Sequence, residues 1–556
     1  SISAGASLIT IEVSENRNDN TLLIGIYDNG KGMSEEQVKS VIDPFFTTRT
    51  TRKVGMGIPL FKMAAEQVIH LSGSVRATVY SDAKLLVLLV LGCAAIGFVA
   101  SVILTYSRTC RGGGIPTSVA AIKGMISFKW LASILLLPIS ALLTFLCGLP
   151  LGTEGPCVQI GTAVGDGIVS SVAGKSKHRG WRRYIMTGGA SAGFSVATGA
   201  PITAVIFSIE EIQKRLSPIL LIVASISVTT AQLTANFLES LGMGTTRLFH
   251  LDVMPKMSHG TLFAPIIIGL VCGLCAILFT RLYHTVEDLM HKVLKKVSIK
   301  VIFPILFASI AVVGFFLSDA LGTGHSLVDT LFETRITWYI ILLLLLVRVI
   351  FMSVSNSSGV TGGVFLPTLA FGAMVGSLCG EAMIALGWIG AEHYTLTVVL
   401  GITAFLGSVS RIPVTACVFA IEAMGGIENI IPIIVVSSIA LLTVEISGLD
   451  DFTDTLIEAK LKSITKGKKR AVIEVPLKVG ADAFVIGKEV KDILWPHSCL
   501  VISFEHSNLV RGTSQILEGD VVTMYYETYD PKSTADELEI LVGKQDEETR
   551  RIMNPS

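Results

Sequence analysis

One acidic side chain, Glu154, lies in a turn rich in glycine and proline, "GTEGP" (152–156), directly after the apolar run 131–147. An ionisable group at the edge of a membrane-type segment is costly to bury, so its presence there indicates a function. Two other turns have the same form, with glycine followed by proline: "GGGIP" (112–116) and "GVFLP" (363–367). These three turns are the parts of the sequence with the clearest potential for chemistry.

Turns of this form open helices and leave backbone N–H groups without partners. Glycine allows another backbone or a ligand to approach closely, and proline fits the first turn of a helix. A helix N-terminus carries partial positive charge and hydrogen-bond donors, which suits an anion that must also leave. Inside a membrane these donors must face protein, water or an anion. Three converging turns would form an anion site, whereas one turn alone would be a helix cap.

The composition predicts that these turns lie in a membrane protein. The chain has 556 residues, 51% of them hydrophobic and only 16% charged, with a mean hydropathy of +0.66. A soluble domain carries about 25% charged residues. Apolar runs long enough to cross a bilayer, such as 85–106, 301–321 and 430–446, recur along the chain. The balance of 44 basic and 44 acidic residues gives no electrostatic argument for nucleic-acid binding.

The sequence divides into four parts. We predict a soluble piece over 1–80, a membrane domain over 82–460, a charged linker over 461–470 and a small α/β domain over 471–546. The expected fold class is an all-α polytopic membrane protein with small α/β soluble domains at both ends. In the last domain we expect "AVIEVPL" (471–477) and "SCLVISFEH" (498–506) as strands, "GKEVKDILW" (487–495) as a helix, and "EGDVVTMYYE" (518–527) as a turn that leads into a third strand.

The membrane domain repeats internally. "APITAVIFSIEE" (200–211) matches "IPVTACVFAIEA" (412–423) at an offset of 212. At an offset of 211, "GTEGP" falls on "GVFLP", and "GTAVG" (161–165) falls on "GAMVG" (372–376). Paired halves in a membrane protein are typical of transporters, whose site lies where broken helices of the two halves meet.

The order GxGIP, GxEGP and GxFxP, with "IEE" (209–211) between the second and third, resembles the CLC chloride channels and proton-coupled chloride antiporters. The resemblance runs from about residue 84 to residue 458. It implies a helical homodimer in a bacterial-type cell membrane, with one anion path per subunit and two oppositely oriented repeats. Chloride or a similar small anion and protons would be transported, the protein would not be an enzyme, and no cofactor or metal is implied.

The resemblance also assigns roles to two carboxylates. Glu154 corresponds to the gating glutamate, which competes with the anion when ionised and swings away when protonated. Glu211 corresponds to the internal glutamate that passes protons in antiporters. The alternatives are a helix cap for Glu154 and a surface carboxylate, ion-paired with Lys214 or Arg215, for Glu211. Glu210 and its repeat mate Glu422 are expected to be structural carboxylates at helix ends.

The anion-binding residues implied by the resemblance lie in the three turns and near residue 452. They are Gly113, Gly114, Ile115, Thr153, Gly155, Val364, Phe365, Leu366 and Phe452. Two positions depart from the family, because Gly113 stands where a serine is usual and Phe452 where a tyrosine is usual. Each missing hydrogen bond to a charged group is worth roughly 1.5–3 kcal/mol. We therefore expect weaker anion selectivity or looser proton coupling, with fluoride or nitrate transport and a passive chloride channel as alternatives.

The N-terminal piece resembles the ATP-binding fold of histidine kinases and related GHKL ATPases through "DNGKGM" (28–33) and "DPFFTTRTTRKVGMGIPL" (43–60). The resemblance implies adenine contact by Asp28 and phosphate contact near Gly30, Gly32, Gly55 and Gly57. The Asn-bearing helix that would hold the metal ion is expected to precede residue 1, and two incomplete domains are expected to join near residue 80. ATP turnover is therefore not expected, although a membrane-anchored sensor kinase is the rival function.

The tail, with "VISFEHSN" (501–508) and "ILEGDVVTMYYE" (516–527), resembles the small C-terminal lobe of RCK/TrkA-type regulators. That resemblance implies a cytoplasmic sensor or dimer contact, and a purely structural role is equally open. Basic segments at 174–183, 213–216 and 291–300 are expected on the cytoplasmic side.

Overall fold

The computed structural model forms two compact units, Ser1–Val54 and Gly55–Ser556. It describes residues 9–16, 21–28, 57–80, 83–126, 128–172, 180–249, 251, 254–257, 261–464, 470–504 and 510–554. In the described part of the first unit, β1 (Ile9–Asn16) pairs antiparallel with β2 (Thr21–Asp28), with Ile9 opposite Asp28.

Within the described ranges, seven helices of the second unit are long and apolar enough to cross a membrane. They are α3 (Ala83–Tyr106), α9 (Pro218–Ser240), α10 (Phe263–Leu294), α11 (Ile299–Phe316), α13 (Trp338–Ser358), α14 (Phe365–Ala385) and α17 (Ile430–Ile446). Many of their apolar side chains face outward, such as Leu88 on α3, Leu278 on α10 and Ile305 on α11. An outward apolar surface of this kind fits contact with lipid.

The remaining described elements of residues 108–464 are mostly shorter, and two of the three glycine turns open helices among them. They are η2 (Arg108–Cys110), α4 (Gly114–Ile122), α5 (Trp130–Leu146), α6 (Glu154–Val172), α7 (Arg182–Thr198), α8 (Pro201–Phe207), η4 (Ser208–Gln213), η6 (Ser318–Ala320), α12 (His325–Glu333), η7 (Ala391–His393), α15 (Tyr394–Val409), α16 (Pro413–Met424), η8 (Gly426–Asn429) and α18 (Phe452–Ile464). Nearly every residue of α15 is buried, so this helix lies at the centre of the packing.

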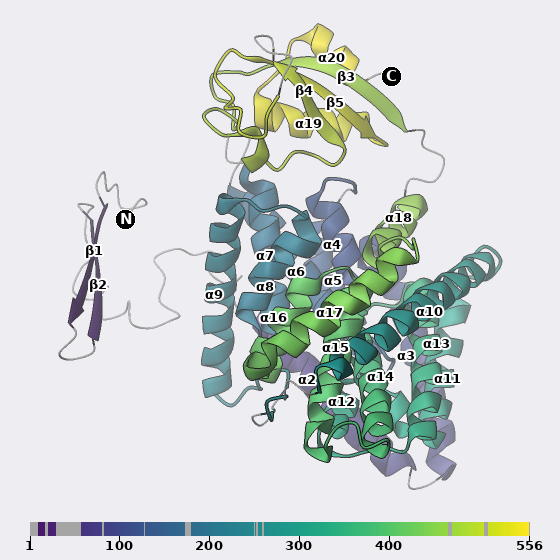
Figure 1. The fold of residues 1–556 in the computed structure, drawn as a ribbon. Helices are drawn as coiled ribbons and strands as arrows, with labels where there is room; N and C mark the ends of the chain where they lie inside the picture. The colour runs from purple at the N-terminus through teal and green to yellow at the C-terminus, as the bar shows by residue number, and fades with distance from the viewer. Residues whose placement is uncertain are drawn as a thin grey trace, which may run out of the picture. The chain divides into compact units, whose positions relative to one another are not determined.

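The predicted internal repeat is present in the structure. Gly152 and Gly363, which are equivalent in the two halves, pair with each other, and each N–H donates to the other's carbonyl oxygen at 2.7 Å. The packing of α6 on α7 recurs in α14 on α15, both times through facing glycines. Figure 1 shows α8 (blue) beside its counterpart α16 (green). These reciprocal contacts between equivalent residues indicate that the two halves are related by pseudo-two-fold symmetry.

The carboxylates Glu210 and Glu422 connect the halves reciprocally. Glu422 accepts hydrogen bonds from the backbone N–H of Ile202 and of Thr203, both at 2.8 Å, at the start of α8. Glu210 does the same at the start of α16, where the N–H groups of Val414 and Thr415 donate at 3.1 and 2.7 Å. Each carboxylate satisfies donors that a helix N-terminus leaves unpaired, as expected for structural groups.

Helix α2 (Gly57–Tyr80) belongs to the second unit, although the sequence pattern grouped it with the soluble N-terminal piece. One face of α2, with Ile58, Phe61 and Ala65, is buried in the same hydrophobic core as the membrane-type helices. The unit boundary accordingly falls between residues 54 and 55 rather than near residue 80.

The C-terminal residues form a small α/β body. In its described part, β3 (Ala471–Lys478), β5 (Val521–Thr528) and β4 (Cys499–Phe504) pair antiparallel in the order β3-β5-β4, and the three predicted strands are confirmed. Two helices that the sequence pattern did not reveal, α19 (Pro531–Val542) and α20 (Glu547–Met553), complete it.

The predicted helix over 487–495 is wrong, because only the short turn η9 (Val490–Asp492) forms there. Glu489 forms an isolated bridge with Gln515, and the buried side chains of Ile493 and Leu494 anchor the segment in an extended path. Tertiary packing overrides the local helical pattern at this place.

Candidate anion site

The three glycine turns meet at one place in the second unit. A Cβ atom on Gly114 would lie 1.9 Å from the carbonyl oxygen of Gly155, and one on Gly155 would lie 2.8 Å from the Cα of Gly363. Both distances are too short for any side chain, so backbone packs directly on backbone. The turns 112–116, 152–156 and 363–367 therefore share one buried region, as the sequence analysis expected of an anion site.

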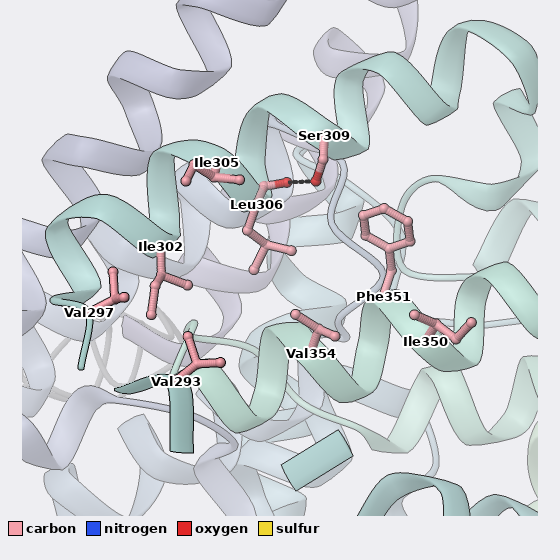
Figure 2. Close-up of a pocket in the computed structure, with 9 residues that line it drawn as sticks. All are labelled: Val293, Val297, Ile302, Ile305, Leu306, Ser309, Ile350, Phe351 and Val354. Atoms are coloured by element: carbon pink, nitrogen blue, oxygen red, sulfur yellow. Dashed lines mark hydrogen bonds between the residues drawn. The ribbon is translucent and has the colours of Figure 1, made fainter. Parts of the chain in front are cut away.

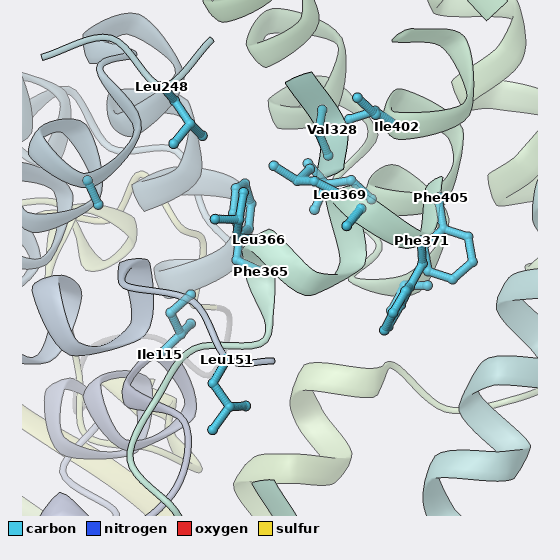
Figure 3. Packing of buried hydrophobic residues seen from close by; sticks show 14 of the residues in the cluster. Ile115, Leu151, Leu248, Val328, Phe365, Leu366, Leu369, Phe371, Ile402 and Phe405 are labelled. Carbon is cyan, nitrogen blue, oxygen red and sulfur yellow. The ribbon is translucent and has the colours of Figure 1, made fainter. Parts of the chain in front are cut away.

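Each turn opens a helix into this region. Gly113 is the N-cap of α4, which begins with Gly114 and Ile115, and Val364 is the N-cap of α14. Figure 3 shows Phe365 and Leu366 on the first turn of α14, close to the segments that carry Ile115 and Leu151. Helix starts from both halves thus place backbone donors and partial positive charge in the same interior.

Glu154 is the first residue of α6 and is completely buried. Neither of its carboxylate oxygens makes a well-formed hydrogen bond to a described residue, although the backbone N–H groups of Glu154 and Leu366 lie close to the carboxylate. Its Oε2 lies over Gly152, only 2.2 Å from where a Cβ on that glycine would stand, and Thr153 beside it is also buried. A carboxylate that lies among backbone donors without a well-formed hydrogen bond fits a movable group better than a firmly bonded cap.

Glu211 lies in η4, a π-helical turn after α8, and only 3% of its surface is exposed. Its Oε2 has no hydrogen-bond partner within the described ranges. Lys214 pairs instead with Asp451 at 2.9 Å and with Asp454 at 2.7 Å. The alternative of Glu211 as an ion-paired surface carboxylate therefore does not match this geometry. Single π-helical turns within helices occur frequently at functional sites.

Phe452 begins α18 and is buried among aromatic rings. Its ring centroid lies 4.8 Å from that of Tyr283 and 5.4 Å from that of Phe279. The hydroxyl of Tyr283 donates to Oδ1 of Asn356 at 2.8 Å. Neither Tyr283 nor Asn356 was singled out from the sequence, because both lie in long apolar helices outside the glycine turns.

Of the nucleotide-binding residues expected near the N-terminus, the described part of the chain includes Asp28 and Gly57. Asp28 is the last residue of β2, and Gly57 is the exposed first residue of α2. Gly30, Gly32 and Gly55 lie outside the described residues. Within the described ranges, no group of three or more His, Cys, Asp or Glu side chains could hold a metal ion.

An apolar groove of about 430 Å³ lies between α10, α11 and α13 (Figure 2). Its lining is apolar except for Ser309, whose hydroxyl donates to the carbonyl oxygen of Leu306 at 2.8 Å. None of the lining residues belongs to the three glycine turns, so this groove is separate from the anion site.

Comparison with known proteins agrees with this arrangement. The family model described as "Voltage gated chloride channel" matches residues 94–445, and that of the "Histidine kinase-, DNA gyrase B-, and HSP90-like ATPase" matches residues 1–85. A relative from Vibrio cholerae, "H(+)/Cl(-) exchange transporter ClcA", is 24% identical over 430 residues, covering 76% of this chain and 91% of the relative. The protein of the same name from Klebsiella pneumoniae is 24% identical over 362 residues, covering 64% and 75%.

Solved structures share the fold. A slow cyanobacterial Cl⁻/H⁺ antiporter superposes with a TM-score of 0.66 at 19% identity, over 77% of this chain and 99% of that one. A CLC-type fluoride/proton antiporter gives a TM-score of 0.55 at 20% identity, over 71% and 96%. The voltage-gated chloride channel model matches residues 94–445, which is more than half of this chain. The chain therefore belongs to the voltage-gated chloride channel family, the CLC family.

Proposed function

We propose that the chain exchanges chloride for protons across a lipid bilayer, with Glu154 as the gate. One observation carries the proposal. Three glycine turns from the two halves meet around a completely buried carboxylate, which lies close to the backbone N–H of Leu366 in the third turn without a well-formed hydrogen bond. The named relatives are H⁺/Cl⁻ exchange transporters, which agrees with this function.

The physical mechanism follows from competition for the same donors. Backbone N–H groups at the starts of α4 and α14 attract a dehydrated anion without a fixed cation that would trap it. The ionised carboxylate of Glu154 is also an anion, so it binds in the same field and excludes chloride. Protonation removes its charge and this attraction, and the side chain can then leave. Anion entry and proton uptake are thereby linked.

Glu211 carries protons on the internal side in this proposal. It is buried, it belongs to a π-helical turn, and Lys214 is occupied by Asp451 and Asp454. A buried acid that no cation neutralises can take up and release a proton, whereas a tight ion pair would hold it ionised.

The test is simultaneous recording of chloride and proton movement in proteoliposomes. An imposed chloride gradient should drive protons uphill through the unmodified protein. Glu211→Gln should stop proton movement while chloride still flows, and Glu428→Gln, at an exposed position on η8, is the matched control. Protons that still move uphill in Glu211→Gln would refute its role. A passive channel predicts chloride flux with no uphill proton movement in the unmodified protein.

Chloride is the first candidate ion, and fluoride and nitrate are the alternatives. Backbone donors recognise negative charge and small size rather than a particular halide, so the three turns alone do not separate these anions. Uptake of chloride, fluoride and nitrate into the same vesicles ranks them directly. A strong preference for fluoride or nitrate over chloride would replace the proposed substrate and leave the proposed gate in place.

The assembly we propose is a homodimer in a bacterial-type cell membrane, with residues 471–546 as a cytoplasmic RCK/TrkA-C-like regulatory domain. Support comes from neighbouring apolar side chains that point outward on α8, α9, α16 and α17, namely Ile202, Ile226, Val414 and Ile431. The mass of the detergent-solubilised protein, measured by light scattering, should equal two chains. A mass of one chain would contradict the dimer.

The rival function is an ATP-hydrolysing sensor kinase, favoured by the family match over residues 1–85. It predicts ATP hydrolysis and no ion flux, so an ATPase assay on the same preparation separates the two functions. The exchange function predicts chloride-driven proton movement without any requirement for ATP.

A further inference from the structure

The anion site contains a side-chain donor at a place that the family resemblance does not assign. Asn356 lies near the end of α13 and is 8% exposed. Its Oδ1 accepts the hydroxyl proton of Tyr283 at 2.8 Å. With Oδ1 on the Tyr283 hydroxyl, the Nδ2 group of the same amide points away from Tyr283.

The Nδ2 group of Asn356 faces the first glycine turn. A Cβ atom on Gly113 would lie 3.4 Å from this nitrogen, and one on Gly112 would lie 3.9 Å from the Asn356 carbonyl oxygen. Nδ2 has no hydrogen-bond partner in the part of the chain that the structure describes. An amide N–H₂ that is buried without a partner costs roughly 1–3 kcal/mol, so a ligand that accepts from it would recover this cost.

Gly113 and Phe452, which replace the hydroxyl-bearing residues usual in the family, lie on either side of the Asn356 amide. Gly113 faces it directly, and Phe452 packs edge-on against the ring of Tyr283, with 4.8 Å between the centroids. A continuous line of contacts therefore runs from Phe452 through Tyr283 and Asn356 to the glycine turn. The polar group in this line is an amide from α13 instead of hydroxyls from the starts of α4 and α18.

We propose that Asn356 is an anion-binding residue, and that its Nδ2 donates to the transported anion in place of the two missing hydroxyls. Tyr283 is the positioning residue, because its hydroxyl bond holds the amide with Nδ2 toward the turn. The inference rests on the proposed anion transport and names a specificity-determining group of that site. An amide N–H₂ donates and cannot accept at its nitrogen, so this position favours an anion over a cation.

The direct test is chloride binding to the purified full chain by calorimetry, together with flux from proteoliposomes. Asn356→Leu keeps the approximate shape and removes the donor, and we expect about tenfold or greater weakening of chloride binding, as for loss of a hydrogen bond to a charged group. Asn356→Asp puts an oxygen in place of the N–H₂ and should weaken binding further. Ser353→Ala on the same helix, where the hydroxyl donates only to the Val349 carbonyl at 2.7 Å, is the matched control.

A rescue variant separates a binding role from a structural one. Gly113 has an extended conformation with φ −68° and ψ 133°, which any residue adopts. Removal of the amide in Asn356→Ala makes room, so Gly113→Ser in that background should restore much of the lost affinity through a hydroxyl. Tyr283→Phe should lower affinity a few-fold and change the ratio of chloride to nitrate flux, which a purely structural role would not change.

The outcomes distinguish this inference from the proposed function. If the unmodified protein binds and transports chloride while folded Asn356→Leu and Asn356→Asp bind it equally tightly, the inference is wrong and the proposed function stands. If the unmodified protein neither binds nor transports any small anion, the proposed function fails and the inference fails with it. Weakened binding with rescue by Gly113→Ser supports both.

Discussion

Contacts between single glycines determine how closely the three turns of the anion site approach. Gly114 packs on the carbonyl of Gly155, and Gly155 packs on the Cα of Gly363. These residues are glycine because there is no space for a Cβ, and close approach brings donors from three helix starts into one region. Donor position matters because displacement by about 1 Å can cost on the order of a hundredfold in rate at a reacting site.

Gly114→Ala is the corresponding prediction. Its Cβ would stand 1.9 Å from the Gly155 oxygen, so the turns must separate, and we expect chloride flux to fall about tenfold or more with a destabilisation of about 1–3 kcal/mol. Proteoliposome flux and thermal unfolding in detergent measure the two effects. Gly92→Ala is the control, because no described atom outside its helix lies within 4 Å of its Cβ position. Equal flux from both variants would contradict the close packing.

The sequence located the glycine turns and the carboxylates Glu154 and Glu211, because residue types and spacing are local, and the family resemblance supplied the proposed roles of the two carboxylates. It did not predict the contact between Tyr283 and Asn356, which are 73 positions apart and come from different helices. Tertiary packing alone brings these two side chains together. A single Asn in an apolar helix forms no sequence pattern that would indicate such a contact. Phe452 and Gly113, which stand where the family usually has tyrosine and serine, indicated only that two hydroxyl donors were absent.

At the scale of elements, reciprocal capping fixes the two halves against each other. The start of α8 is capped by Glu422 from the end of α16, and the start of α16 is capped by Glu210 from η4. Because η4 also carries Glu211, the cap holds the segment of the internal carboxylate in place. The repeat in the sequence predicted equivalent residues, but not that each half would cap the other.

Glu422→Gln should lower stability by about 1–2 kcal/mol, because the charge and one acceptor of a helix cap are lost. Glu210→Gln should have a similar effect, since it occupies the equivalent position, with an added loss of proton coupling through displacement of η4. Thermal unfolding in detergent measures the stability, with exposed Glu428→Gln as the control. Unchanged unfolding temperatures in both cap variants would show that these bonds contribute nothing to the joining of the halves.

At the scale of the whole molecule, the second unit contains all described parts of the anion site, while residues 1–54 form a separate unit. The membrane character and the repeat were predictable, since apolar run length and spacing are properties of the sequence itself. The assignment of α2 to the second unit was not predictable, because an amphipathic helix buries its apolar face equally well against a soluble core or against membrane helices.

Deletion of residues 1–54 should leave chloride flux and its proton coupling unchanged. Deletion of residues 1–82, which also removes α2, should sharply lower the yield of folded protein because Ile58, Phe61 and Ala65 leave the core. Size-exclusion chromatography and flux from proteoliposomes measure both. Loss of transport in the shorter deletion would show that the first unit takes part in transport and would favour the sensor-kinase alternative.

The central claim is that the Glu154 carboxylate competes with the anion for the same helix-start donors. The most direct measurement is simultaneous chloride and proton flux from vesicles that contain Glu154→Gln, which mimics the protonated side chain. We predict that chloride still flows and that a chloride gradient no longer drives protons. Protons that still move uphill through this variant, or a folded variant that passes no chloride, would contradict the account.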